Sequence, residues 1–243
     1  MLRIHSLETF GTSDGPGIRL VVFTQGCLFR CLYCHNPDSL PVHSQTARDL
    51  SLAELLDHLE KQRPYFRQKG GLTFSGGEPT LQADALLEYL PVIRRAGFNV
   101  ALDTCGALFN EKVQRVYDQT DLVILDVKHI DPAWHQRITG QDNVNVLKNA
   151  AWREQSGKPL WLRYVLVPGY TDQPEYLHQW AQTFSPYRSL ERVEILPYHT
   201  LGVHKYAQLG RTYALAGVQP PAPAAVEAAA DIFRAYFEQV VVH

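Results

Sequence analysis

The sequence lacks long apolar runs, an excess of one charge and an abundance of cysteine. No segment approaches the roughly 18 consecutive apolar residues of a membrane span, and residues 1–8 lack the apolar core of a signal peptide. Lys and Arg number 23 against 25 Asp and Glu, which favours neither a nucleic-acid partner nor a charged tail. We therefore expect a cytoplasmic protein with no nucleic-acid or membrane partner. We also expect a monomer, which these features do not bear on.

Cysteine is scarce, yet three of the four residues lie within eight positions, at Cys27, Cys31 and Cys34. Thiolates this close repel one another unless a metal neutralises them or two of them form a disulfide. So few cysteines fit a reduced compartment and a metal better than a secreted disulfide framework. Three protein ligands leave one coordination position open for a substrate, as in a catalytic metal site.

Four interpretations of this cluster of cysteines compete. Cys31-x-x-Cys34-His35 matches covalent haem attachment, and Cys31-x-x-Cys34 alone matches a dithiol redox motif. Haem attachment leaves Cys27 unexplained and needs export. A Cys3His zinc site requires the adjacent Cys34 and His35 to bind one ion, which is geometrically awkward. The remaining interpretation is a [4Fe–4S] cluster with three cysteine ligands and one open iron.

Strand-like and helix-like segments alternate six times along the chain, which predicts an α/β fold of parallel strands joined by helices. The expected strands cover residues 18–23, 72–75, 98–103, 121–126, 160–167 and 192–196. One helix is expected to begin after a Ser51 cap, with an apolar stripe through Leu59, and the others cover about 81–96, 111–118, a stretch ending near 154, 174–184 and 224–240. We expect one domain, 1–243, with an N-terminal extension (1–17), a cluster loop (26–36) and a C-terminal helix (about 224–240). Polar residues follow several strands, where the C-terminal ends of parallel strands carry the chemistry.

Four segments, 4–19, 121–128, 161–169 and 197–206, together with the C-x3-C-x2-C spacing, resemble the glycyl-radical-enzyme activating enzymes of the radical S-adenosylmethionine (SAM) type. The resemblance covers nearly the whole chain and is strongest to the members that act on pyruvate formate-lyase. It implies a partial (β/α)6 barrel, similar to a TIM barrel but open on one side. Cys27, Cys31 and Cys34 would hold three irons, and SAM would bind the fourth.

The resemblance also implies a set of SAM contacts: Tyr33, Gly76, Gly77, Glu78, Lys128 and His199. Each has a plainer alternative. Gly-Gly-Glu could be a strand-to-helix turn with Glu78 at the helix start, Tyr33 could belong to the core, and Lys128 or His199 could be an ordinary hydrogen-bonded side chain. His35 is expected to be a loop residue rather than a ligand.

Further positions follow from the same resemblance. Asp103, Thr104 and Asp126 would bind a monovalent cation, Na⁺ or K⁺, since hard oxygen ligands suit such an ion. The alternative is that both aspartates cap the helices that follow them. Asp14 and Arg163 would contact the glycine loop of the partner; alternatively, Asp14 stabilises its own turn and Arg163 pairs with a carboxylate such as Asp126.

Two features depart from the family pattern or narrow it. Cys105 stands where Asn is expected, and a small buried hydrophobe is its expected role. Residues 36–70 contain no cysteine, whereas several relatives carry a ferredoxin-like insert there, so a single cluster is implied.

The activity implied is reductive cleavage of SAM to a 5′-deoxyadenosyl radical that removes a hydrogen from a glycine Cα of pyruvate formate-lyase, in anaerobic metabolism. The cluster and SAM carry this chemistry, and no further catalytic residue is expected. A flavodoxin- or ferredoxin-type donor would supply the electron. The alternatives are an activase of another glycyl radical enzyme, a radical SAM enzyme for a small molecule, or an electron carrier that binds metal or haem.

Overall fold

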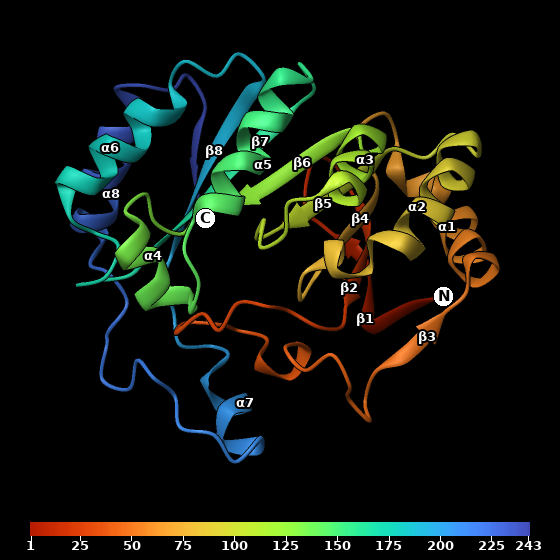
Figure 1. The fold of residues 1–243 in the computed structure, drawn as a ribbon, viewed down its shortest axis with the longest axis horizontal. Coiled ribbons are helices and arrows are strands. Elements are labelled where there is room, and N and C mark those ends of the chain that lie inside the picture. Colours follow the sequence, from red (N-terminus) through yellow and green to blue (C-terminus); the bar gives the residue numbers. More distant parts are fainter. The chain divides into compact units, whose positions relative to one another are not determined.

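The computed structural model describes residues 1–243, which form two compact units. The first unit comprises Met1–Leu28 and Ser39–Ile124, and the second comprises Phe29–Asp38 and Leu125–His243. In each unit helices pack beside the strands (Figure 1). The expectation of one domain spanning the chain stays a prediction.

The first unit is built on a mixed sheet with the strand order β3-β1-β2-β4-β5-β6. Its strands are β1 (Leu2–Gly11), β2 (Arg19–Thr24), β3 (Arg48–Leu50), β4 (Gly71–Gly76), β5 (Val100–Thr104) and β6 (Leu122–Asp126), whose last two residues belong to the second unit. β2 pairs parallel with β4 and β4 with β5, while β1 pairs antiparallel with β2 and β3. The expected N-terminal extension, residues 1–17, stays a prediction, and most of it is strand β1. A strand with one buried face needs only alternate apolar residues, and Leu2 and Ile4 supply them.

The helices of the first unit include one whose start the sequence predicts from a capping residue. They are η1 (Pro37–Ser39, at the boundary), α1 (Leu52–Phe66), η2 (Pro79–Gln82), α2 (Ala83–Arg95) and α3 (Glu111–Gln119). The Ser51 side chain accepts a hydrogen bond from the Glu54 N–H at 3.2 Å, which is the predicted cap of α1. α2 runs without interruption through Pro91, and Gly97 follows its end with φ 81°.

The second unit has the strand order β7-β8-β9, with both pairs parallel. Its elements are α4 (Pro132–Thr139), α5 (Val144–Gln155), β7 (Leu160–Leu166), α6 (Pro174–Phe184), β8 (Leu190–Pro197), α7 (Val203–Gln208), α8 (Pro223–Arg234) and β9 (Val240–Val242). The C-terminal helix expected to reach about residue 240 ends at Arg234. Residues 240–242 are three valines, whose branched side chains favour a strand, and they pair with β8.

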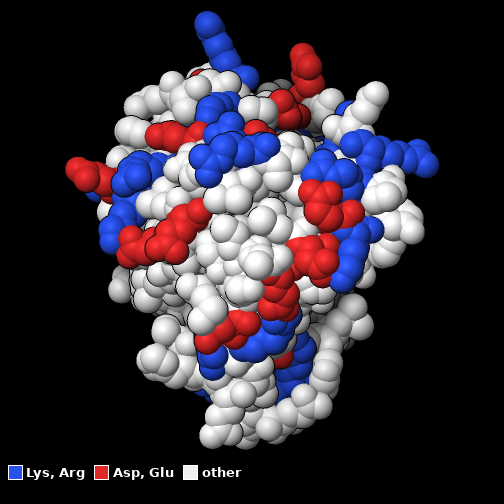
Figure 2. Space-filling model, turned by 90° about the vertical axis from the view of Figure 1, so that its right-hand side faces the viewer, with Lys and Arg blue, Asp and Glu red and all other residues white.

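The predicted fold class is confirmed: an α/β chain whose parallel strands do not close into a barrel. The strand order has free ends at β3 in the first unit and at β9 in the second. No helix is long and apolar enough to cross a membrane. Positive and negative side chains are interspersed over the face drawn in Figure 2, as the balanced composition predicts.

Candidate active site

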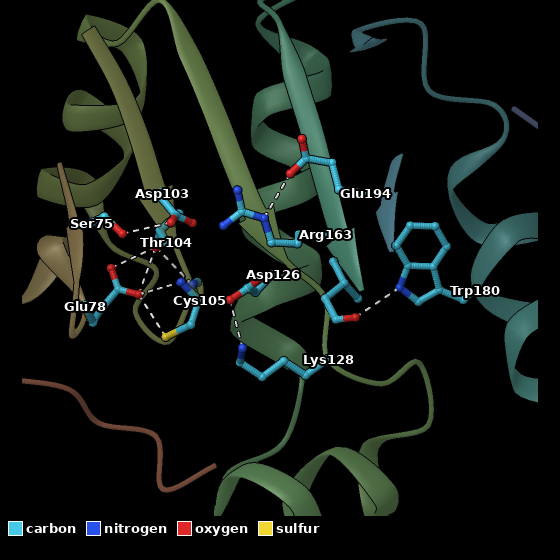
Figure 3. A network of polar contacts seen from close by, with 12 residues as sticks. Ser75, Glu78, Asp103, Thr104, Cys105, Asp126, Lys128, Arg163, Trp180 and Glu194 are labelled. Atoms are coloured by element: carbon cyan, nitrogen blue, oxygen red, sulfur yellow. Dashed lines mark hydrogen bonds and ion pairs between the residues drawn. The ribbon is translucent and has the colours of Figure 1, made fainter. Parts of the chain in front are cut away.

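Glu78 is fully buried in the first unit, where it caps η2 just after β4. Its carboxylate accepts hydrogen bonds from the Thr80 N–H at 3.0 Å and the Thr80 hydroxyl at 2.7 Å. The Thr104 hydroxyl lies 2.8 Å from both carboxylate oxygens, and Cys105 donates from its N–H and its thiol, each at 2.9 Å (Figure 3). Glu78 therefore connects η2 to the end of β5. Its position at the start of η2 agrees with the alternative in which Glu78 is a helix-start carboxylate. A contact with SAM stays a prediction.

Gly76 and Gly77 allow the end of β4 to pass close to the start of the cysteine loop. A Cβ on Gly77 would lie 2.2 Å from the Gly26 carbonyl oxygen, and one on Gly76 would lie 2.5 Å from the Thr24 nitrogen. The Gly77 and Glu78 N–H groups donate to the carbonyls of Thr24 and Gly26 at 3.0 and 2.7 Å. Because residues 76 and 77 are glycines, their backbone can lie directly against the backbone of residues 24–26.

Cys27 and Cys105 are both buried and lie beside each other in the first unit. Burial raises the pKa of the Cys105 thiol well above its ordinary value, and the hydrogen bond with Cys27 and the charge of Glu78 raise it further. The expectation of a small buried hydrophobe was incomplete, because both the thiol and the N–H of Cys105 donate to Glu78. All four cysteines of the chain are free of disulfides.

Asp103 and Asp126 do not have the helix-capping role that was their alternative. Asp103 accepts a hydrogen bond from the Ser75 hydroxyl at 2.8 Å. α3 is capped by Asn110 and α4 by Asp131, whose side chains accept N–H bonds at 3.1 and 2.8 Å. Asp103 and Asp126 therefore cap neither helix.

In the second unit, Asp126 is ion-paired with Lys128 through Oδ2 at 2.8 Å, whereas its Oδ1 is buried without a partner. Burial alone would lower the pKa of Lys128. The charge of Asp126 opposes this, followed by Tyr33 and Cys31, so the pKa lies well above its ordinary value and Lys128 stays cationic. Its Nζ lies 5.7 Å from the centre of the Tyr33 ring. Tyr33 is packed in an apolar cluster of this unit, as its core alternative predicts, but its buried hydroxyl has no partner.

Cys31 and Cys34 lie half-buried in a turn that α4 and α7 fix in place. The Cys34 N–H donates to the Cys31 carbonyl at 3.1 Å, and the Arg30 N–H donates to the Thr139 carbonyl at 2.7 Å. On the other side, the Tyr206 hydroxyl donates to the Cys34 carbonyl at 2.9 Å. Sequence reasoning missed Tyr206, because nothing local relates it to a cysteine 172 positions away.

His35 stacks on His199, with ring centres 4.1 Å apart, and its Nε2 lies 3.0 Å from the His199 carbonyl oxygen. Burial is the main cause that lowers the pKa of His35. A Cβ on Gly202 would meet the His35 backbone at 2.8 Å, so the segment after β8 packs tightly on the end of the cysteine motif. His35 is a loop residue in this arrangement, and the contact of His199 with SAM stays a prediction.

Arg163 donates from Nε to Glu194 at 3.0 Å, so it pairs with a carboxylate, as its plainer alternative predicts. Glu194 is almost fully buried and also lies within 3.7 Å of Arg192 and 3.5 Å of His243. Sequence reasoning missed Glu194. An acidic residue between apolar neighbours in a strand was the available signal, since such a charge needs a partner.

Asp14 lies on the loop between β1 and β2, at the opposite end of β2 from Cys27. Its carbonyl accepts a hydrogen bond from the Thr73 hydroxyl at 2.7 Å. The loop is held by Arg19, which is fully buried and donates to the carbonyls of Pro16 at 3.1 Å and Leu72 at 2.5 Å. Burial lowers the pKa of Arg19 to about 10, which leaves it cationic at neutral pH.

The donor set of the cysteine loop is of the kind that iron–sulfur clusters use. Nowhere do three or more His, Cys, Asp or Glu side chains converge as the ligands of one metal ion. The three motif cysteines form no disulfide and lie in one short loop, and cysteine thiolates are the ligands that hold iron–sulfur clusters.

The comparisons with known proteins decide the family. Residues 21–181 match the model of the radical SAM superfamily. The chain is 41% identical over 229 residues to the pyruvate formate-lyase-activating enzyme of Listeria monocytogenes, covering 90% of each. It is 42% identical over 233 residues to that of Staphylococcus aureus, covering 93% of this chain and 92% of the relative. The chain belongs to the radical SAM superfamily, in the family of the pyruvate formate-lyase-activating enzymes.

A solved structure shares the fold of these radical SAM proteins with this chain. It is a domain of a pyruvate formate-lyase-activating enzyme from Bacteroides vulgatus, with a TM-score of 0.61 and 24% identity over 72% of this chain and 99% of that one. The resemblance read from the sequence is therefore confirmed. Membership of the radical SAM superfamily implies a [4Fe–4S] cluster and SAM as cofactors.

Proposed function

We propose that this chain is an oxidoreductase that activates pyruvate formate-lyase by creating a radical on one of its glycines. The observation that carries the proposal is the likeness to relatives of that name, which extends at 41–42% identity over at least nine-tenths of both chains. Likeness of this extent includes the cysteine motif and the segments that pack on it.

The bound cofactors would supply the reductive cleavage of the SAM sulfonium and the removal of a hydrogen from the glycine Cα. Cys27, Cys31 and Cys34 would hold the cluster, and α4 and α7 hold the backbone of the second and third cysteines. Lys128, kept cationic beside Cys31, would offset part of the negative charge that three thiolates bring.

The buried Oδ1 of Asp126, which has no partner, supports a ligand at that position. We assign to it a monovalent cation, Na⁺ or K⁺, held together with Asp103 and Thr104. A hydroxyl has two lone pairs, so Thr104 can donate to Glu78 and still offer an oxygen to a cation.

The substrate contacts would come from Asp14 and Arg163, which can hydrogen-bond the main chain of an extended glycine loop. Arg163 is oriented by Glu194, and the Asp14 loop is anchored by Arg19. A one-electron carrier of the flavodoxin or ferredoxin type would supply the electron, and the protein would act as a monomer in the cytoplasm.

The test is an anaerobic reaction of the reconstituted protein with reductant, SAM and pyruvate formate-lyase, followed by electron paramagnetic resonance. We expect a glycyl radical on the partner, and transfer of deuterium into 5′-deoxyadenosine when the partner's glycine is deuterated at Cα. Cleavage of SAM without a radical on pyruvate formate-lyase would contradict the proposal and favour another glycyl radical enzyme or a small molecule as substrate.

A further inference from the structure

Phe10 and Tyr65 are the two aromatic residues among the exposed large hydrophobic side chains of the chain, and they lie together on the first unit. Each is 49% exposed, their ring centres are 4.8 Å apart and the ring planes meet at 64°. The edge-to-face contact stabilises the pair, but half of each side chain still faces water. Aromatic side chains presented in this way are typical anchors of protein interfaces.

The backbone at this point is strained. Phe10 has φ 63° and Arg67, two residues after Tyr65, has φ 49°; no other residue except glycine has a positive φ in the chain. A bulky side chain in the left-handed region is sterically disfavoured. Such strain gathers at functional positions because folding alone gives no reason to keep it.

The pair lies at the base of the loop that carries Asp14. Phe10 precedes Gly11, which pairs with Arg19 across the β1–β2 hairpin, and a Cβ on Gly11 would lie 3.6 Å from the Asp14 carboxylate. On the other side of the loop, a Cβ on Gly17 would meet the Gly70 nitrogen at 2.6 Å. The loop at 12–18 and the chain that leaves α1 are therefore packed together and form one surface.

The chain that leaves α1 adds positive charge to this surface. Arg67 and Lys69 are exposed, and residues 61–77 contain no Asp or Glu. We define the docking patch as Phe10, Tyr65, Arg67 and Lys69. Its complement is a protein surface with an apolar pocket rimmed by acidic side chains.

We propose that the docking patch binds the folded body of the protein substrate, beside the point where its glycine loop passes Asp14. The inference rests on the proposed function and adds a second, larger contact to the loop itself. The patch lies at the start of β2, and Cys27 follows its end. The six residues of β2 span about 20 Å, so a carrier that delivers an electron to the cysteines has no reason to bind at the patch.

The test compares full-length pyruvate formate-lyase with a short peptide that spans its target glycine. Phe10→Gly removes the ring and also relieves the backbone strain, so its unfolding midpoint should equal or exceed that of the wild type. Tyr65→Ser removes the second ring. Val144→Ser, which shortens a 47% exposed apolar side chain on α5 of the second unit, is the matched control.

For Phe10→Gly with Tyr65→Ser, we expect the KM for the full-length partner to rise at least 30-fold, the size of an anchor residue at an interface. The kinetics with the peptide, cluster content and SAM binding should stay as in the wild type, and Val144→Ser should change nothing. An unchanged KM for the full-length partner, or equal losses with peptide and partner, would overturn the docking patch. A loss seen with a protein electron carrier but not with a chemical reductant would assign the surface to the carrier instead. Absence of any glycyl radical with the wild type would remove the proposed function itself.

Discussion

Two carboxylates lie at strand ends, the fully buried Glu78 in the first unit and the partly buried Asp126 in the second, and their hydrogen bonding differs. Both oxygens of Glu78 accept hydrogen bonds from Thr80, Thr104 or Cys105. Asp126 has one oxygen on Lys128 and one buried oxygen with no partner. A carboxylate satisfied by the protein holds elements together, whereas one that lacks a partner has capacity for a ligand.

The same contrast separates the two arginines associated with the substrate side. Arg19 of the first unit is fully buried, and its guanidinium donates hydrogen bonds to main-chain carbonyls and to the side chains of Thr73 and Asn99. Arg163 of the second unit donates to a buried carboxylate, Glu194. Glu78 and Arg19 of the first unit thus mainly hold backbone segments in place, whereas Asp126 and Arg163 of the second unit are charged groups held by one ion pair each that the structure shows.

The largest expected effect tests whether Cys105 belongs with Glu78 or with the motif cysteines. Replacing Cys27, Cys31 or Cys34 by Ala should reduce glycyl-radical formation to background and prevent assembly of a stable cluster. Cys105→Ala should keep about four irons per chain and most of the activity, because its N–H still donates to Glu78. Iron analysis after anaerobic reconstitution measures this, and loss of iron in Cys105→Ala would place Cys105 with the ligands.

The second prediction breaks the network of the first unit. Glu78→Gln puts an NH2 group among the groups that donate to this buried carboxylate, so we expect the free energy of unfolding to fall by about 3–5 kcal/mol. Asp84→Asn, at an exposed carboxylate paired with Lys112, is the control and should change it by less than about 0.5 kcal/mol. Denaturant unfolding of the apoprotein measures both, and equal small losses would show that Glu78 is not structural.

The third prediction tests whether a buried atom without a hydrogen-bond partner in the second unit always indicates a ligand site. His135 is buried, its Nδ1 lies 2.7 Å from the Gln141 carbonyl oxygen, and its Nε2 has no partner. Burial lowers the pKa of His135 to about 4, despite the hydrogen bond to Gln141; Lys128 and His129 also lower it, and Asp142 raises it. The unpartnered Nε2 of His135 therefore goes with a neutral imidazole and does not indicate a bound ligand.

Because the folded pKa of His135 lies below the unfolded value of about 6.5, the unfolded chain binds the extra proton first as the pH falls. Stability should therefore be complete above about pH 6.5 and should decline toward pH 4, by about 3 kcal/mol from this residue. His135→Asn should flatten that part of the stability profile. A profile of unchanged slope in His135→Asn would show that other groups cause the acid loss.

Local patterns predicted most of the fold, and their failures have local causes too. α6 begins and ends at the predicted residues because Pro174 suits the first turn and an apolar stripe runs to Phe184. β1 was missed because its polar alternation reads as a loop until a partner strand buries one face. β9 was missed because its valines extend a helical run in which nothing but tertiary pairing marks a strand.

The candidate site could be predicted only where its residues lie close together in one short sequence motif. The cysteine spacing indicates a cluster, but the donors to Glu78 include Cys105, 27 positions away, and the partner of Arg163 is 31 positions away. Distances in space between such residues depend on strand register. Single-residue patterns contain no information on register, so both networks required the structure.

The smallest expected effect on stability tests the ligand capacity of Asp126 directly. Asp126→Asn keeps an oxygen for Lys128 but loses the charge, so the free energy of unfolding should fall by only about 1 kcal/mol. SAM affinity should fall about tenfold, which is about 1.4 kcal/mol, and any dependence of SAM binding on Na⁺ or K⁺ should disappear. Asp131→Asn is the matched control, because Asn caps α4 as well as Asp does. Titration of SAM in cation-exchanged buffer measures the difference. A wild-type protein that binds SAM equally with and without Na⁺ or K⁺ would show that Asp126 serves Lys128 alone, and the contrast with Glu78 would then be one of exposure and not of function.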